Sequence, residues 1–405
     1  MPPRGSLEAI SSESQLNYSL SEQCGTQLGI PELNALALRS LATLFDEKGG
    51  LFSRSVTFDV KGALHRQKPS PRRTIIALLG LHRLKESGES LPFDVPSICY
   101  VMSRDTSWVK SLGDLGLLTW FIAEYEPDRL KNLFHEFKFK SAIEDFRDGR
   151  QAQTRGLAWF LAGIAHARLA QPQAAPDLID VAVNTYHLLE DNHSDGGIFG
   201  HAALTGFLQR TFYKRFGTFS DQIYSIYALV TFAKAFQIEE PLGLALNCGN
   251  AIRELQGELG QWWFLYDKRA SRVMTQYPVL TLHQTGTAPL GLLALEEATG
   301  QSFQVPVQRG LSWVAGTNEL ARDMRDIGRA VIWDSIERKR STLGCLDTAI
   351  SLISISHRTR RESLRIRCAT RPDHFGWLLY AFGRLGLPKA RVATKLARDC
   401  AGPVG

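Results

Sequence analysis

The feature that most constrains this fold is an alternation between two kinds of predicted helix. Beyond residue 30, an amphipathic segment is followed, about six times, by a segment that is apolar on most of its surface. A helix that is apolar all round needs neighbours on every side, whereas an amphipathic helix can leave one face in water. Six such pairs in a ring place the apolar helices inside. The sequence therefore predicts an all-α fold, an (α/α)6 toroid of about six helical hairpins.

The predicted helices have recognisable start and stop signals, with Pro near several first turns and Gly or Pro after several ends. The apolar helices are predicted over 71–86, 114–124, 151–170, 220–236, 281–299 and 372–387. The other helices are predicted over 31–47, 92–102, 128–145, 176–190, 241–256 and 305–316. Strands with a convincing period of two are hard to find. An irregular helical protein and an open superhelix of helical repeats are the alternatives to a closed ring.

Composition and charge bound the class of protein. The 405 residues are 44% hydrophobic and 22% charged, which leaves room for a large core. The net charge of +6 is spread along the chain, and the densest basic run is HRTRRESLRIR at 357–367. Such a run is usually a solvated face, and an anion-binding patch is the alternative. Without aromatic interleaving or zinc spacing, we expect no nucleic-acid partner.

Targeting and cofactor signals are also lacking in the sequence. The six cysteines form no CxxC or metal spacing, which is typical of reduced thiols and predicts a cytoplasmic protein. No stretch approaches the roughly 20 apolar residues that span a bilayer, and the first residues lack a signal-peptide core. No P-loop, GxGxxG, GxSxG or HExxH occurs, so we expect neither cofactor nor metal. We predict a loose arm over 1–30, one domain over 31–390 and a tail over 391–405.

A weak internal repeat supports the ring. The segments 180–200, 250–263 and 307–333 each contain a helix, a polar linker, a Gly-containing turn and an aromatic residue. They resemble the prenyltransferase and squalene-cyclase repeat, and SDGGIFG at 194–200 is the best match. The resemblance covers about a third of the chain and implies the α/α-toroid superfamily. That shape is shared by terpenoid cyclases, prenyltransferase β-subunits, six-hairpin glycosidases, polysaccharide lyases and sugar epimerases.

Candidate functional residues lie at the starts of the apolar helices and in the long connections, which a toroid brings to one end. The catalytic candidates, which can transfer protons, are Asp221, Tyr224, Tyr277, His283 and Asp326. The substrate-binding candidates, which can stack or form hydrogen bonds, are Gln222, Tyr227, Trp262, Trp263, Asp267, Gln284 and His374. This mixture suits a polar, ring-shaped small molecule or oligosaccharide.

Most of these residues also have a structural interpretation. Asp221 can cap the helix that follows it, and Tyr224 and Tyr227, three apart on one helix face, can be core aromatics. His283 can be a general base near neutral pH or a buried, hydrogen-bonded histidine.

The same holds for the loop candidates. Trp262 and Trp263 form either an aromatic wall for a ligand or a hydrophobic staple between hairpins. Asp323 and Asp326 are either a carboxylate pair or part of a salt-bridged surface loop.

The preferred function is a carbohydrate-processing enzyme of glycosidase, lyase or epimerase type. In a hydrolase, two carboxylates such as Asp221 and Asp267 or Asp326 would flank the bond. In a lyase or epimerase, Tyr224 or Tyr277 with His283 would move a ring proton.

Two alternatives remain. A terpenoid-cyclase-like or isoprenoid-binding protein would need an apolar cavity, and the DxDD, DDxxD and prenyltransferase zinc patterns are missing. A non-catalytic binding or scaffold protein would use the toroid as a surface, and a filled barrel without a pocket would favour it.

Overall fold

The computed structural model describes residues 29–59, 61–137, 139, 152–173, 178–204, 214–339 and 363–388. The predicted tail and all but the last two residues of the predicted arm lie outside this part. The extent of the predicted domain stays a prediction.

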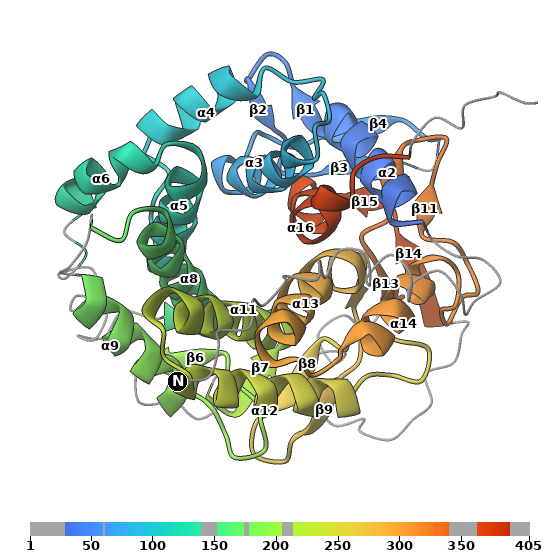
Figure 1. Ribbon diagram of the computed structural model, residues 1–405. Helices are drawn as coiled ribbons and strands as arrows, with labels where there is room; N and C mark the ends of the chain where they lie inside the picture. Colours follow the sequence, from blue (N-terminus) through green and yellow to red (C-terminus); the bar gives the residue numbers. More distant parts are fainter. Residues whose placement is uncertain are drawn as a thin grey trace, which may run out of the picture.

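The core of the protein is a closed ring of inner helices (Figure 1). In chain order they are α3 (Pro71–Glu86), α5 (Leu112–Tyr125), α8 (Thr154–Ala170), α11 (Phe219–Phe236), α13 (Ala288–Thr299) and α16 (Pro372–Phe382). Each packs against the next, and α16 packs against α3 to close the ring. This confirms the predicted toroid.

A second layer of helices covers the ring, and each of its members precedes an inner helix in the chain (Figure 1). They are α2 (Ile30–Leu44), α4 (Val95–Arg104), α6 (Leu130–Phe137), α9 (Leu178–Asp191), α12 (Glu240–Glu254) and α14 (Gln304–Val314). Every residue from 113 to 123 of α5 is buried, whereas α12 buries one face. The difference in apolar surface between the two kinds of helix therefore decides which layer each occupies.

Glycines allow the inner helices to approach closely. A Cβ added at Gly163 of α8 would lie 2.2 Å from the carbonyl oxygen of Gly116 on α5. A Cβ added at Gly80 of α3 would lie 2.2 Å from the carbonyl oxygen of Gly376 on α16. Larger side chains would push these backbones apart.

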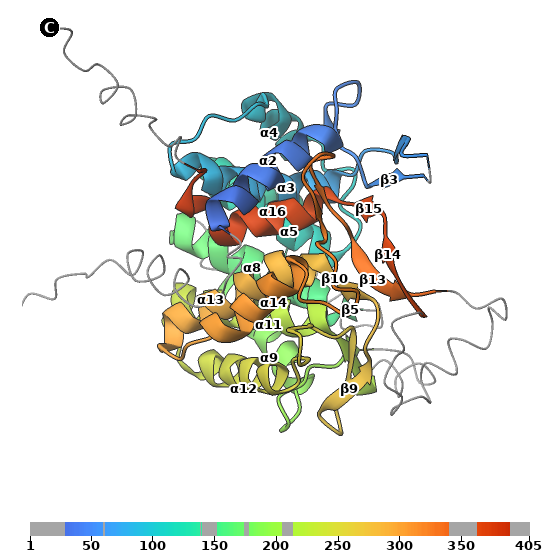
Figure 2. The ribbon, with the colours of Figure 1, turned by 90° about the vertical axis from the view of Figure 1, so that its right-hand side faces the viewer.

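The structure corrects the sequence analysis on strands. Two-stranded antiparallel sheets pair β1 (Phe45–Asp46) with β2 (Leu51–Phe52), β5 (Ala152–Gln153) with β6 (Ala202–Leu204), and β11 (Arg325–Asp326) with β12 (Val331–Ile332). In the three-stranded antiparallel sheets the order of strands is β15 (Ala369–Thr370), β3 (Val56–Phe58), β4 (Leu64–Arg66); β7 (Phe216–Thr218), β8 (Leu265–Asp267), β9 (Arg272–Thr275); and β10 (Val279–Leu280), β13 (Ser335–Arg338), β14 (Leu364–Arg367). Strands β3, β13, β14 and β15 lie on one side of the molecule in Figure 2. Strands of two to four residues are too short to show a period of two.

A second correction concerns the helix predicted over 281–299. The chain is helical from residue 281 as predicted, but a π-helical segment, η2 (His283–Thr287), interrupts it before α13 (Ala288–Thr299). The 3₁₀ turns η1 (Pro127–Arg129) and η4 (Gly383–Leu385) likewise replace the start of one predicted helix and the end of another. Within the described ranges, no helix combines the length and the apolar content needed to cross a bilayer. The cytoplasmic location stays a prediction.

Candidate active site

The N-terminal ends of the inner helices meet at one end of the ring, which we call the mouth. Four polar contacts join neighbouring helices there: Arg72 Nε to Asp114 Oδ1 (2.6 Å), Arg73 Nε to Asp373 Oδ1 (3.4 Å), Arg155 N to Asp221 Oδ1 (3.3 Å), and Thr285 Oγ1 to His374 Nε2 (2.6 Å). The predicted convergence of the helix starts is therefore present in the structure.

Two histidines are buried in the mouth. His283 and His374 are each only 2% exposed. The Nδ1 atom of His283 lies 3.1 Å from Thr287 Oγ1, within the π-helical turn. Burial, and next the positive charge of Arg371, lower the pKa of both imidazoles to about 3. Both rings are therefore neutral near pH 7.

Aromatic side chains line the inner helices beside these histidines. The Tyr224 ring lies 5.1 Å from Trp159 and 5.7 Å from Trp377, measured between centroids. The Arg155 guanidinium lies 5.2 Å from the centre of the Trp159 ring. Burial raises the pKa of Tyr224, so its hydroxyl keeps its proton at neutral pH.

A hollow of about 320 Å³ opens at the mouth, and we call it the basic hollow. It is lined by Arg54, Ser55, Gln67, Arg73, Asp334, Arg367, Ala369 and Arg371. Arg371 Nε lies 2.7 Å from Asp334 Oδ1. Burial opposes the charge on Arg371, but Asp373 and Asp334 outweigh it and raise the pKa of the guanidinium. The hollow is therefore cationic and adjoins the two neutral histidines.

Sequence analysis missed most of the hollow. Arg54 and Asp334 lie in short irregular links between strands, and Arg371 is the residue before α16. Arg367 belongs to the basic run at 357–367. The alternative interpretation of that run as an anion-binding patch was the signal in the sequence that could have found the hollow.

Asp221 is held by the start of its own helix. Its Oδ2 accepts hydrogen bonds from Thr218 N (2.8 Å) and Thr218 Oγ1 (2.6 Å) in a capping box, and lies 2.8 Å from His201 Nδ1. The hydrogen bond to Asp221, which outweighs burial, raises the pKa of His201. The geometry favours the capping role that was the alternative for Asp221.

The other two aspartate candidates have arginine partners of their own. Asp267 is fully buried, and its Oδ2 accepts from Arg215 at 2.9 and 3.2 Å. Asp326 lies on the β11–β12 hairpin, where its Oδ2 accepts from Arg329 at 2.8 Å.

The aromatic candidates outside the inner ring pack against other aromatic side chains. Tyr277 donates to Glu319 Oε1 at 3.0 Å, and its ring lies 6.1 Å from Trp263, edge to face. Trp262 is fully buried and stacks on Phe219 at 5.2 Å.

The two glutamine candidates are fully buried as well. Gln222 accepts from Phe199 N at 2.7 Å and donates to Phe199 O at 2.9 Å, which ties its amide to a connecting loop. Gln284 follows His283 in the π-helical turn.

Tyr227 lies towards the opposite end of the ring, in what we call the Glu124 network. This network consists of Arg83, Trp120, Glu124, His166, Tyr227 and Tyr380. Glu124 Oε1 accepts from Arg83 (2.7 Å), Tyr380 (2.7 Å) and Trp120 (3.1 Å). His166 stacks on Trp120 at 4.5 Å, and its Nε2 lies 2.9 Å from the Tyr227 hydroxyl.

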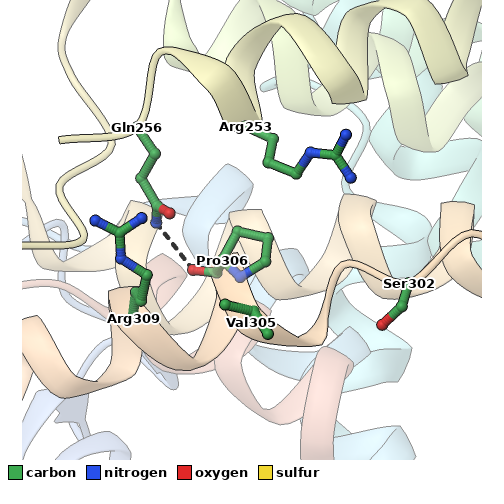
Figure 3. A pocket seen from close by; sticks show the side chains of 6 residues that line it. All are labelled: Arg253, Gln256, Ser302, Val305, Pro306 and Arg309. Carbon is green, nitrogen blue, oxygen red and sulfur yellow. Dashed lines mark hydrogen bonds between the residues drawn. The ribbon is translucent and has the colours of Figure 1, made fainter. Parts of the chain in front are cut away.

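A second hollow, of about 300 Å³, lies between the outer helices α12 and α14 (Figure 3). Gln256 crosses it and donates to Pro306 O at 2.9 Å, with Arg253 and Arg309 nearby. Its lining contains no carboxylate, histidine or tyrosine, so it offers no group for proton transfer near neutral pH.

Comparison with known proteins identifies the fold. No protein-family model and no curated protein sequence matches this chain. Solved structures do match this chain, and they show that its fold is that of the α/α toroids.

Three similar structures illustrate this. A possible GH105-family member from Salmonella enterica is 12% identical with a TM-score of 0.55, covering 91% of this chain and 97% of its own. Cellobiose 2-epimerase from Bacillus thermoamylovorans is 11% identical with a TM-score of 0.59, covering 88% and 99%. Unsaturated glucuronyl hydrolase from Streptococcus agalactiae is 12% identical with a TM-score of 0.56, covering 94% and 96%.

Proposed function

We propose that this chain is a carbohydrate-processing enzyme that acts on a saccharide held at the mouth. The structures that share its fold carry the names of a GH105-family member, a sugar epimerase and a glucuronyl hydrolase. Because one fold can host many activities, the proposal depends on the mouth itself. The observation that carries it is a pair of neutral imidazoles, His283 and His374, buried beside the Arg371 cation.

This arrangement favours proton transfer at carbon, as in a lyase or an epimerase. In the proposed step, His283 takes a proton from a carbon next to a carbonyl or carboxylate group, and the C–H electron pair moves onto that group. The Arg371 guanidinium stabilises the negative charge that develops. Tyr224 gives its proton to the opposite face of the carbon in an epimerase, or to the leaving oxygen in a lyase. His283 then releases its proton to solvent, and Tyr224 takes up a proton from solvent.

A two-carboxylate hydrolysis receives less support from the geometry. Asp221, Asp267 and Asp326 each engage their own cap or arginine partner. Their catalytic roles and that of Tyr277 stay predictions, and the proposed step does not use them. The substrate-binding roles predicted for Gln222, Tyr227, Trp262, Trp263, Asp267 and Gln284 also stay predictions. The proposal keeps His374 and adds Trp159 as a surface on which a sugar ring can stack.

The basic hollow also bears on the alternatives. Arginine and aspartate side chains suit a polar ligand, whereas an isoprenoid chain needs an apolar lining. The proposal includes no cofactor, metal or nucleic-acid partner. A scaffold protein without turnover remains the competing hypothesis that the experiment has to exclude.

The experiment is incubation in D₂O with a panel of neutral and acidic oligosaccharides, followed by NMR. We expect an epimerase to place deuterium on the carbon that it inverts, and a lyase to form an unsaturated product that has lost the hydrogen of that carbon. His283→Gln should lose either activity. His166→Gln, which changes a buried histidine at the other end of the ring, is the matched control. Cleavage to a saturated product, with no deuterium on a ring carbon, would replace proton transfer by hydrolysis. Turnover of no saccharide would contradict the proposed function.

A further inference from the structure

The basic hollow holds more positive charge than its acidic partners neutralise. Four arginines and one aspartate line it. Asp334 is shared, because Arg371 lies 2.7 Å and Arg367 3.7 Å from its carboxylate. Asp373, just outside the lining, lies 3.4 Å from Arg73. Among the described residues, two carboxylates therefore face four guanidinium groups, which leaves a net positive charge.

Two of these cations keep hydrogen-bonding capacity. The Nη2 atom of Arg371 is buried and has no hydrogen-bond partner among the described residues. Within the same part of the chain, the exposed Arg54 side chain has no carboxylate at ion-pair distance. A buried guanidinium donor without a partner is costly, and an anion that enters the hollow would remove that cost.

The backbone fixes the positions of these arginines. Strand β15 pairs with β3, with Ala369 opposite Thr57, so two distant parts of the chain meet beside the hollow. Arg73 donates to the backbone carbonyl of Arg54, which anchors α3 to the same region. The positive charges are therefore held in place by sheet pairing and a helix start.

We propose that the basic hollow binds an anionic substituent, a carboxylate or a sulfate ester, of the saccharide that occupies the mouth. This inference rests on the proposed function. Guanidinium groups bind such oxyanions through two parallel hydrogen bonds. Arg371 connects the two regions, because it lines the hollow and also lowers the pKa of His283. An anion in the hollow thus orients the sugar ring toward the histidines.

Calorimetric titration of the full chain at low ionic strength tests this inference. The ligands are a glucuronate-containing disaccharide, its neutral glucose counterpart, a 6-sulfated counterpart and inorganic sulfate alone. We expect a charged disaccharide to bind at least roughly tenfold more tightly than the neutral one, which corresponds to about 1.4 kcal/mol. Added salt should reduce this preference.

Variants on the rim of the hollow localise the effect. Arg54→Gln and Arg367→Gln should each weaken binding of the charged disaccharide by about threefold to tenfold and leave the neutral one unchanged. Arg365→Gln is the matched control on the same strand. Its side chain is 50% exposed, close to the 58% of Arg367, but it pairs with Glu337. We expect it to change neither affinity.

The possible outcomes separate the two proposals. Equal affinity for charged and neutral disaccharides would overturn the inference and leave the proposed function standing. Sulfate alone binding as tightly as the sulfated disaccharide would also overturn it, because the sugar would then add nothing. Binding of no disaccharide would contradict the proposed function itself. A preference for the carboxylated or the sulfated ligand, abolished in the rim variants, supports the inference and identifies the group.

Discussion

The two ends of the inner ring contain similar side chains in different states. Both ends have buried histidine, tyrosine, tryptophan, arginine and a carboxylate. In the Glu124 network these groups face one another, and Glu124 accepts three hydrogen bonds. At the mouth the histidines are neutral beside an excess of arginine, and a hollow opens above them.

This difference separates a structural network from a candidate site. Buried polar groups that satisfy one another stabilise a single packing of the helices. Buried polar groups with remaining capacity cost stability and offer that capacity to a ligand. We infer from this comparison that the Glu124 end stabilises the fold and that the mouth carries the proposed chemistry, and substitutions can test each inference.

The largest expected effect comes from exchanging one histidine at each end. His283→Gln should lower kcat by roughly 10²–10⁴-fold, because it removes the proposed base. His166→Gln should leave kcat near the wild-type value and lower the free energy of unfolding by about 1–3 kcal/mol through its lost contacts. Steady-state kinetics and urea unfolding of both variants measure this. Equal losses of kcat would remove the distinction between the ends.

The next effect concerns the carboxylate of the network. Glu124→Ala leaves the Arg83 guanidinium and the Tyr380 hydroxyl without their acceptor, and Glu124 is only 8% exposed. We expect a loss of about 3–5 kcal/mol in the free energy of unfolding. Glu86→Ala, which also removes a partner of Arg83 but at a side chain 37% exposed, should cost about 1 kcal/mol or less. Similar unfolding curves for the two variants would show that Glu124 is not the centre of the network.

The smallest effect is a change in pH dependence. Burial lowers the pKa of His166 from 6.5 to about 4. The folded protein therefore keeps this ring neutral while the unfolded chain protonates it, so its stabilising contribution is present above pH 6.5 and is lost as the pH falls toward 4. His283 and His374 act in the same direction.

Free energies of unfolding measured between about pH 4 and pH 6.5 test the predicted sign of this pH dependence. The wild-type slope should be positive, and His166→Gln should flatten it by up to about 1.4 kcal/mol per pH unit. An unchanged slope in the variant would mean that His166 titrates alike in the folded and unfolded states.

The fold was largely predictable because burial patterns are local in the sequence. Helix α5 was expected over 114–124 and is observed as Leu112–Tyr125, since a segment apolar on every side has only an interior position available. The π-helical turn at His283 leaves no such pattern. Strands β13 and β14 were missed because four residues cannot show a period and their pairing joins distant segments.

The candidate site was predictable only in part, for a related reason. His283, His374 and Tyr224 could be found because they interrupt or begin apolar helices. Arg54 and Arg371 come together through pairing of β3 with β15, which no local pattern encodes. Conversely, Asp221 looked catalytic because a capping carboxylate and a catalytic carboxylate can occupy the same sequence position.

The most direct test of the central claim is a crystal structure of the protein soaked with acidic and neutral saccharides. We predict density for a sugar at the mouth, in contact with Arg371 and Trp159 and within hydrogen-bonding distance of His283. A sugar found only in the hollow between α12 and α14, or an apolar molecule occupying the mouth, would contradict the account.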